Sequence, residues 1–219
     1  MVWDALGISL KVALVSTCVV GIVGGLIGRH LARHNYHGKV FLDALLMAPM
    51  FVPPTVLGYY LTLLFGPKAP LGSALASIGI EVAFTWLGAA LASAVVALPI
   101  MVRAARIAFE SIDREVEDAA AIDGAGRWRT LLHIALPLAR NGLISGAALA
   151  FARAVGEFGA TLMLSGNIPG RTQTIPLAIY EAFATGDDNA AMTLSILLTV
   201  VSLVVITVSL RLGHGTSRW

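Results

Sequence analysis

The sequence predicts an all-helical protein that crosses a membrane. Its 219 residues are 57% hydrophobic and only 13% charged, whereas soluble domains carry about a quarter charged residues. Water therefore cannot be the solvent for most of the surface. The hydrophobic residues also fall into long runs, each near the ~20 residues that a helix needs to cross a bilayer.

Five apolar segments are long enough to be membrane spans. They cover residues 6–28, 41–65, 82–102, 142–164 and 191–210. Because backbone polar groups must be satisfied within lipid, we expect each segment to be helical. A β-barrel would need alternating polarity along its strands, which these segments lack. The first segment has no basic flank and no clear cleavage pattern, so we expect it to be retained as a span.

The basic residues predict how the chain is oriented. Arginine and lysine collect in the connectors that follow the first, third and fifth segments, whereas the opposite side holds only Lys11, Lys68 and Arg171. Connectors rich in positive charge stay in the cytoplasm. We therefore expect residues 1–219 to form one multi-pass membrane domain, with the N-terminus outside and the C-terminus inside.

Several functional classes lack support in the sequence. The net charge of +2 is too small for a nucleic-acid-binding surface. The chain has no phosphate-binding loop for ATP and no H-E-x-x-H zinc motif. The single cysteine, Cys18, lies in an apolar run, where a reactive role is disfavoured. With no nucleophile–base pair either, we predict no catalytic residue, metal or cofactor in this chain.

The long cytoplasmic connector over residues 111–140 is amphipathic. Ser111 or Asp113 can cap a helix whose first turn holds Glu115, a favourable position for an acidic residue. Helices that only adsorb to a membrane surface usually carry Lys and Arg on their polar face. This helix carries mainly Asp and Glu, which favours docking onto a basic partner.

The same connector contains signals for a break and a second helix. Gly124 and Gly126 end the first helix. A short amphipathic helix follows, and Pro137 either ends it or opens the next span. We expect two short helices lying against the cytoplasmic ends of the spans.

The stretch DAAAIDGA at residues 118–125, followed by an isoleucine and a Leu-Pro pair, resembles the EAA loop of ABC importer permeases. The resemblance implies that residues 111–137 dock into a groove on a separate ATPase subunit. Asp118 stands where the usual glutamate would be, with Glu117 just before it, so either carboxylate could dock. The implied coupling residues are Glu117, Asp118, Ala119, Ala120, Asp123, Gly124, Ala125, Ile134, Leu136 and Pro137.

Further motifs extend the resemblance over nearly the whole chain. They are MAP at 47–49, VPPTVLGYY at 52–60, FTWLGA at 84–89, GAGRWR at 124–129, FARAVGEFGAT at 151–161 and NIPG at 167–170. Together they resemble the molybdate and sulfate permease family of type I ABC importers. The GEFGAT stretch is shared in part with sulfate permeases, whereas the PPTVxGYY stretch points to molybdate.

This resemblance implies the type I ABC importer permease fold, a place in the bacterial cytoplasmic (inner) membrane, and molybdate uptake by alternating access. The implied partners are a second copy of this chain in a homodimer, two ATPase subunits that bind ATP and Mg²⁺, and a periplasmic or lipid-anchored molybdate-binding protein. Tungstate or sulfate/thiosulfate are alternative substrates of the same fold. An ATPase-independent anion channel or facilitator is the alternative from another class, and it would need no acidic helix pair.

Two charged residues lie inside the fourth apolar segment. Arg153 and Glu157 are four residues apart, and ionisable groups in the bilayer tend to face the bundle interior or a water-filled cavity. They could form an ion pair that fixes packing. Alternatively, Arg153 attracts the oxyanion and Glu157 neutralises it when the site is empty.

Three prolines interrupt the second apolar segment at positions 49, 53 and 54. Prolines free backbone carbonyls, which must find other partners. The segment is either a kinked helix that lines the translocation path or a kink that suits packing. The candidate path residues are Pro53, Pro54, Thr55, Tyr59, Arg153, Glu157 and Thr161.

Two further features leave alternatives open. His30, His34 and His37 could present imidazoles to a metal, but no acidic or cysteine side chain accompanies them, which favours a basic juxtamembrane cluster near anionic lipid. The outer segment 165–189 contains a possible short helix at 175–184. In the resembled family this face meets the binding protein; otherwise it is an ordinary loop.

Overall fold

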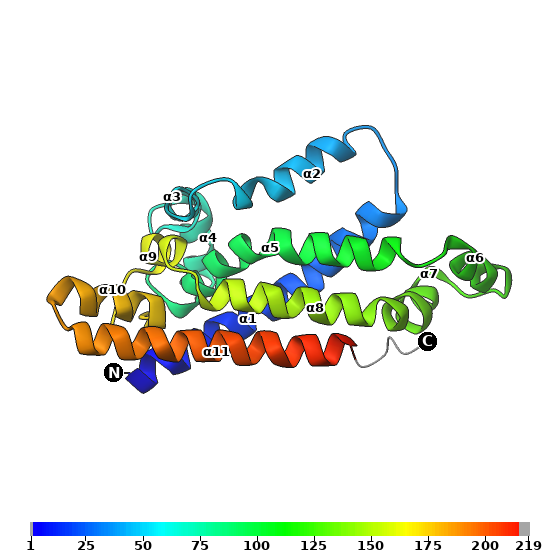
Figure 1. The fold of residues 1–219 in the computed structure, drawn as a ribbon. Helices are drawn as coiled ribbons and strands as arrows, with labels where there is room; N and C mark the ends of the chain where they lie inside the picture. The colour runs from blue at the N-terminus through cyan, green and yellow to red at the C-terminus, as the bar shows by residue number, and fades with distance from the viewer. Residues whose placement is uncertain (1, 215–219) are drawn as a thin grey trace.

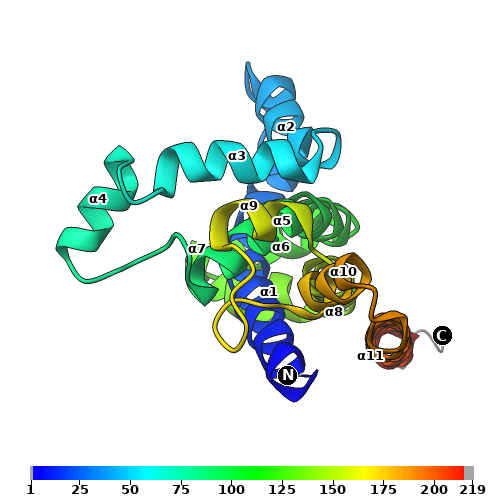
Figure 2. The ribbon, with the colours of Figure 1, turned by 90° about the vertical axis from the view of Figure 1, so that its left-hand side faces the viewer.

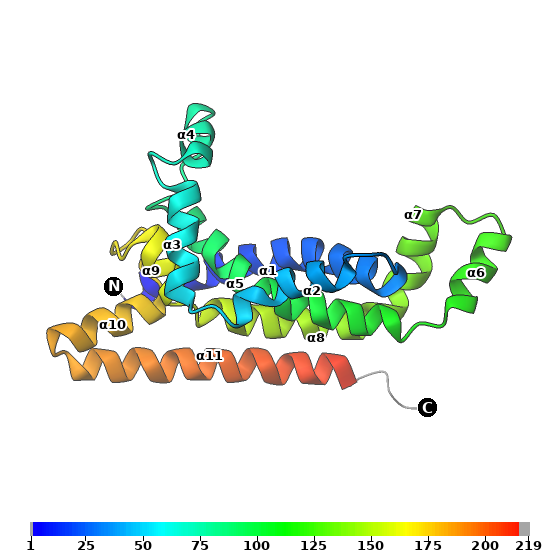
Figure 3. The same cartoon turned by 90° about the horizontal axis from the view of Figure 1, so that it is seen from above.

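The computed structural model describes residues 2–214, which form a bundle of helices without strands. Four long helices run along the molecule: α1 (Val2–Arg33), α5 (Trp86–Glu110), α8 (Leu136–Val155) and α11 (Asp188–His214) (Figure 1). Shorter helices gather at one end: α3 (Pro54–Phe65), α4 (Pro70–Ser77), α9 (Gly159–Ser165) and α10 (Ile175–Thr185) (Figure 3). At the other end lie α6 (Arg114–Ile122) and α7 (Arg127–Thr130).

Helix α5 is the centre of the bundle and packs between α1 and α8. Glycines on both neighbours make this possible. A Cβ added to Gly28 of α1 would lie 2.6 Å from the Cβ of Ala105, and one added to Gly146 of α8 would lie 2.5 Å from the Cβ of Ala104. Such small residues let helix backbones approach closely in membranes.

The long helices match the predicted spans, with shifted boundaries. By length and composition, four stretches can cross a membrane: Val2–Arg33, Trp86–Glu110, Arg127–Val155 and Asp188–Val208. The bent pair over 39–65 would make a fifth. The third span thus extends to Glu110, beyond the expected end at residue 102, because Arg103 and Arg106 continue the helix past its apolar part.

The second predicted span is broken more sharply than a kink. It consists of α2 (Lys39–Met47), a 3₁₀ turn η1 (Ala48–Met50) and α3, with a bend of 108° between its two halves. Pro53 has an extended backbone with ψ of 135°, because a residue that precedes proline avoids the helical region. Pro54 then opens a new helix, which crosses the end of the bundle (Figure 2).

The fourth predicted span also differs from a single helix over 142–164. Helix α8 ends at Val155, and α9 begins at Gly159. Glu157 lies in the break, where its Oε1 accepts a hydrogen bond of 2.8 Å from the backbone N–H of Ala160. A side-chain acceptor at this position satisfies a donor that the start of a helix leaves free. Arg153 therefore lies in α8, whereas Glu157 lies beyond its end, in the break before α9.

The connector over 111–137 contains the first predicted short helix, α6, whereas the second is not separate but continuous with α8. Of the two possible caps, Asp113 is the one used, since its Oδ1 accepts from the N–H of Glu115 at 3.1 Å. Helix α7 continues through a π-helical turn, η2 (Leu131–Ala135), into α8. Pro137 lies in the first turn of α8 and so opens that helix. The short outer helix expected at 175–184 is confirmed as α10.

The α1–α5 contact yields a test of the packing. Gly28→Ala should lower the free energy of unfolding by about 1–3 kcal/mol, because the new methyl group overlaps α5. Gly25→Ala is the matched control one turn away, since its Cβ would meet nothing within 4 Å. Thermal unfolding of the detergent-purified protein measures both. Equal melting temperatures for the two variants would contradict the close contact.

Candidate coupling surface and translocation path

The 111–137 segment projects from one end of the bundle (Figure 3). It connects α5 to α8, and its two helices are joined by a turn in which Gly124 has φ of +82°. This left-handed conformation is one that glycine adopts without steric cost. The segment is thus attached directly to two of the long helices.

Glu117 ties α6 to the end of α1. Its Oε1 accepts from Nη2 of Arg33 at 2.7 Å, and its Oε2 lies 3.5 Å from Nη2 of Arg29. Arg33 also donates to the carbonyl of Ile112 at 3.2 Å. These side chains are mostly buried, with exposures of 16% for Glu117 and 11% for Arg33. Glu117 is therefore engaged within the chain.

Asp118 differs from its neighbour because it is exposed. Of the two carboxylates that the sequence left open, it is the one on the free surface. Six predicted coupling residues are exposed: Asp118, Ala119, Asp123, Gly124, Leu136 and Pro137. Ala120, Ala125 and Ile134 are half-buried.

The histidines near this end form no recognisable metal site. The rings of His30 and His34 stack with centroids 4.7 Å apart, and Nδ1 of His34 lies 3.1 Å from the carbonyl of His30. Within residues 2–214, no group of three or more His, Cys, Asp or Glu side chains could hold a metal ion.

The candidate path residues meet where α3 crosses α9. A Cβ on Gly58 would lie 2.8 Å from the Cα of Ala160, and one on Gly159 would lie 3.0 Å from Cγ2 of Thr55. The structure therefore brings residues 53–59 together with residues 157–161. In this cluster Pro53, Thr55 and Tyr59 are exposed, and Pro54 is half-buried.

Arg153 and Glu157 form an ion pair beside this crossing. Nη1 of Arg153 lies 2.8 Å from Oε2 of Glu157, whose side chain is only 2% exposed. The Arg153 side chain keeps 32% exposure, so its remaining donors can reach an anion. Thr161 is fully buried, and its hydroxyl donates to the carbonyl of Phe158 at 2.7 Å. The Thr161 hydroxyl is therefore used within its own helix.

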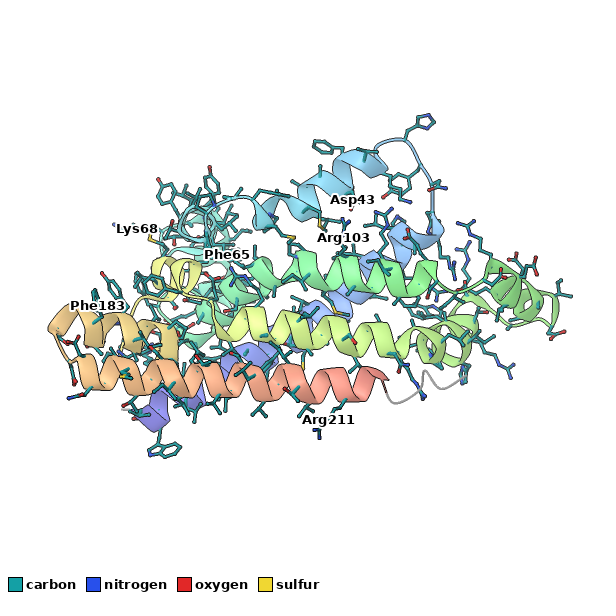
Figure 4. The ribbon with its side chains drawn as sticks, in the orientation of Figure 1. Asp43, Phe65, Lys68, Arg103, Phe183 and Arg211 are labelled. Carbon is teal, nitrogen blue, oxygen red and sulfur yellow. The ribbon has the colours of Figure 1, made fainter. Side chains whose placement is uncertain are left out.

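A further ion pair, which the sequence reasoning missed, joins α2 to α5. Nη1 of Arg106 lies 2.6 Å from Oδ2 of Asp43, and Nε lies 2.8 Å from Oε1 of Glu110. Figure 4 shows Asp43 and Arg103 in the space between the two helices. The available signal was Asp43 itself, since a charge in an apolar segment calls for a partner.

The loop over residues 166–174, which was expected to face outward, is held by polar contacts that the sequence also did not reveal. The side-chain amides of Gln173 and Asn167 both donate to Oε2 of Glu181 in α10. The Ser9 hydroxyl accepts from the N–H of Ile175 at 2.7 Å, which fixes α10 against α1. Phe183 of α10 lies at the end of the bundle opposite α6, whereas Arg211 lies near the C-terminal end of α11 (Figure 4).

Comparison with known proteins identifies a family and its members. A family described as "Binding-protein-dependent transport system inner membrane component" matches residues 21–214. The molybdenum transport system permease protein ModB of Escherichia coli (strain K12) is 43% identical over 219 residues, covering 99% of this chain and 93% of that protein. The sulfate transport system permease protein CysT of the same organism is 35% identical, covering 90% of this chain and 72% of its own length.

A solved structure shares the fold. It is the crystal structure of a bacterial alginate ABC transporter in complex with an alginate pentasaccharide-bound periplasmic protein. Its matching chain superimposes with a TM-score of 0.73 at 17% identity, covering 98% of this chain and 79% of that chain. At this low identity the likeness concerns the fold alone.

The Glu117 contacts predict a difference between two adjacent carboxylates. Glu117→Gln should increase hydrogen exchange of the α6 amides roughly tenfold, because hydrogen bonds to charged groups contribute about 1.5–3 kcal/mol. Asp118→Asn should leave this exchange unchanged. Hydrogen-exchange mass spectrometry of the two purified variants makes the comparison. A double variant with the charges exchanged, Arg33→Glu with Glu117→Arg, should restore the protection of the α6 amides. Equal exchange in both single variants would mean that Glu117 does not hold α6.

Proposed function

Because the chain belongs to the family of binding-protein-dependent transport system inner membrane components, we propose that it is the transmembrane permease subunit of an ATP-driven molybdate importer. The observation that supports molybdate as the substrate is the 43% identity, over 99% of this chain, to a molybdenum transport permease. The permease itself catalyses no covalent step. ATP and Mg²⁺ bind to two separate ATPase subunits.

The 111–137 segment is the coupling loop of this transporter. Its exposed carboxylates, Asp118 and Asp123, suit a basic groove on the ATPase, since complementary charges favour association. When ATP binding closes the ATPases, the two coupling loops are pulled together. Glu117 then passes the movement of α6 to α1 through Arg33 and Arg29.

The translocation path lies at the α3–α9 crossing, at the end of α8. A guanidinium presents several donors in a planar fork that suits oxyanions, and Arg153 is placed there with donors to spare. Glu157 balances its charge when no anion is bound. The exposed apolar face of α3, with Tyr59, Tyr60 and Leu63, supports a homodimer in which two copies enclose one path.

The membrane orientation follows from the positive charge near α6. The N-terminus lies outside, and the coupling loop and C-terminus face the cytoplasm. A periplasmic or lipid-anchored binding protein delivers molybdate to the opposite end, where α10 and the outer loop lie (Figure 1). Import then proceeds by alternating access between the two sides.

A sulfate importer is the second candidate, favoured by the 35% identity to a sulfate permease. Sulfate, molybdate and tungstate share the same charge and tetrahedral shape, so a single arginine would attract each of them. The lower identity and shorter coverage make sulfate the weaker choice.

Uptake measurements test the proposed transport. Cells that express this chain with its genomic neighbours should accumulate labelled molybdate, with competition by excess tungstate but not by sulfate. Gly124→Pro should abolish uptake, because proline fixes φ near −65° and cannot adopt the positive φ of Gly124. Gly126→Ala in the same loop is the control, since a Cβ there meets nothing within 4 Å.

The outcomes separate the alternatives. Competition by sulfate would move the chain to the sulfate importers. Uptake that survives Gly124→Pro, with the protein correctly inserted, would contradict coupling through the 111–137 segment and favour a channel or facilitator.

Arg153 provides a separate test of the path. Arg153→Gln combined with Glu157→Gln removes the charge at the site without leaving a buried charge unpaired. Uptake should fall about tenfold or more, since a hydrogen bond to a charged group is worth about 1.5–3 kcal/mol. Co-purification with the ATPase should persist. Loss of the assembled complex, or normal uptake, would assign the pair to packing alone.

A further inference from the structure

An apolar groove of about 570 Å³ lies between α1 and α8, over the side of α5. Its walls are formed by aliphatic side chains, among them Ile22, Leu26, Leu132, Leu136 and Leu143. Gly21 and Gly25 are part of the α1 wall and carry no side chain. The space in front of them is open, since a Cβ at either position would meet nothing within 4 Å. Ile22 is 67% exposed and Leu26 is 51% exposed, so the groove opens to the surroundings of the bundle.

At the α6 end this groove continues into a polar cavity of about 670 Å³. Arg29, Trp128 and Leu131 line both spaces, which makes them contiguous. The charged residues around the cavity are Arg29, Arg33, Arg114, Arg127, Glu117 and Asp118. Four arginines therefore face two carboxylates, and the cavity has an excess of positive charge.

Several of these arginine donors are available to a ligand. Nη1 of Arg29 is buried and has no hydrogen-bond partner, which is costly for a charged group unless a ligand supplies an acceptor. Arg114 and Arg127 are exposed and form no ion pair with another described residue. Glu117 is already engaged with Arg33.

We propose that this site binds an anionic phospholipid of the cytoplasmic leaflet. The phosphate lies among Arg29, Arg114 and Arg127, and one acyl chain lies in the groove between α1 and α8. Basic pockets between membrane helices on the cytoplasmic side bind such headgroups. Trp128 stands where the polar and apolar spaces meet, and tryptophan is enriched at this depth of a membrane.

The combination of the two spaces selects a lipid over a free anion. Inorganic phosphate or molybdate would satisfy the arginines but would leave the apolar groove without an occupant. A lipid without net charge would fill the groove but would leave the excess positive charge of the cavity uncompensated. A single molecule that combines an acyl chain with a headgroup of net negative charge satisfies both.

Native mass spectrometry of the complete transporter, purified with its ATPase, tests the proposal. The detergent is supplemented with equal amounts of palmitoyl-oleoyl phosphatidylglycerol and phosphatidylcholine. The wild-type complex should retain one phosphatidylglycerol per permease chain and discriminate against phosphatidylcholine. Arg114→Gln with Arg127→Gln should weaken retention about 30-fold, since each arginine near an anionic headgroup contributes about fivefold.

A groove variant and matched controls complete the experiment. Gly25→Leu places a branched side chain in the groove, where the added Cβ meets nothing within 4 Å, and should abolish retention. Arg129→Gln and Gly7→Leu alter an exposed arginine and an open glycine outside the site, and should retain the lipid as the wild type does. Gly25→Leu and Gly7→Leu lie in α1, outside the 111–137 segment, and should assemble with the ATPase as the wild type does.

Three results would overturn the proposal. Equal retention of both lipids would show that the arginines do not select a phosphate with net negative charge. Retention unaffected by Gly25→Leu, with bound lipid displaced by inorganic phosphate or molybdate, would reassign the arginines to a free anion. Loss of the permease dimer in Gly25→Leu but not in Gly7→Leu would assign the groove to a second copy of this chain.

Discussion

Contact between the backbones of α1 and α5 is possible only because glycines of α1 face small or flexible residues of α5. A Cβ on Gly24 would lie 3.0 Å from Cγ of Met101, and one on Gly28 would lie 2.8 Å from the backbone N of Arg106. Lipid exerts no hydrophobic force between helices, so close packing and polar contacts must hold them together. The Ser16 hydroxyl adds such a contact, since it lies 2.7 Å from the carbonyl of Ala90. Helix α8 packs on α5 through glycines in the same way, and the three helices form one body.

The two candidate functional regions are attached to opposite ends of this body, and by different forces. Helix α6 is held mainly through the charge of Glu117, whose partners Arg29 and Arg33 are on α1. Helix α9 is held through close backbone contact with α3 and through the Arg153–Glu157 pair. A closely packed helix transmits displacement along its length because it cannot be compressed. Movement of α6 therefore has a mechanical route to the end of α8, where Arg153 lies.

The apolar segments, the acidic short helix and α10 could be predicted because composition and periodicity are local properties. The break at Pro53 and Pro54 was also visible, but its bend of 108° was not, because the direction of α3 depends on its packing against α9. The break before Gly159 was hidden, since Glu157 resembles a charge within a span, whereas it caps the next helix. The contact of Glu117 with Arg33 joins residues 84 positions apart, and nothing in either local sequence indicates it.

The arginines on the α6 side divide into groups that serve different purposes. The positive-inside pattern counts them equally, because it reports only the side of the membrane on which they lie. In the structure, Arg33 and Arg106 are matched by carboxylates and hold α6 and α2 to the bundle. Arg114 and Arg127 instead face the open cavity. A guanidinium paired with a carboxylate adds little to the local potential, whereas an unpaired one raises it. Arg29 contributes both to attachment of the loop and to attraction of anions, since it lies 3.5 Å from Glu117 and also lines the cavity. Substitution of Arg33 on the one hand, or of Arg114 and Arg127 on the other, can therefore separate attachment of the loop from attraction of anions.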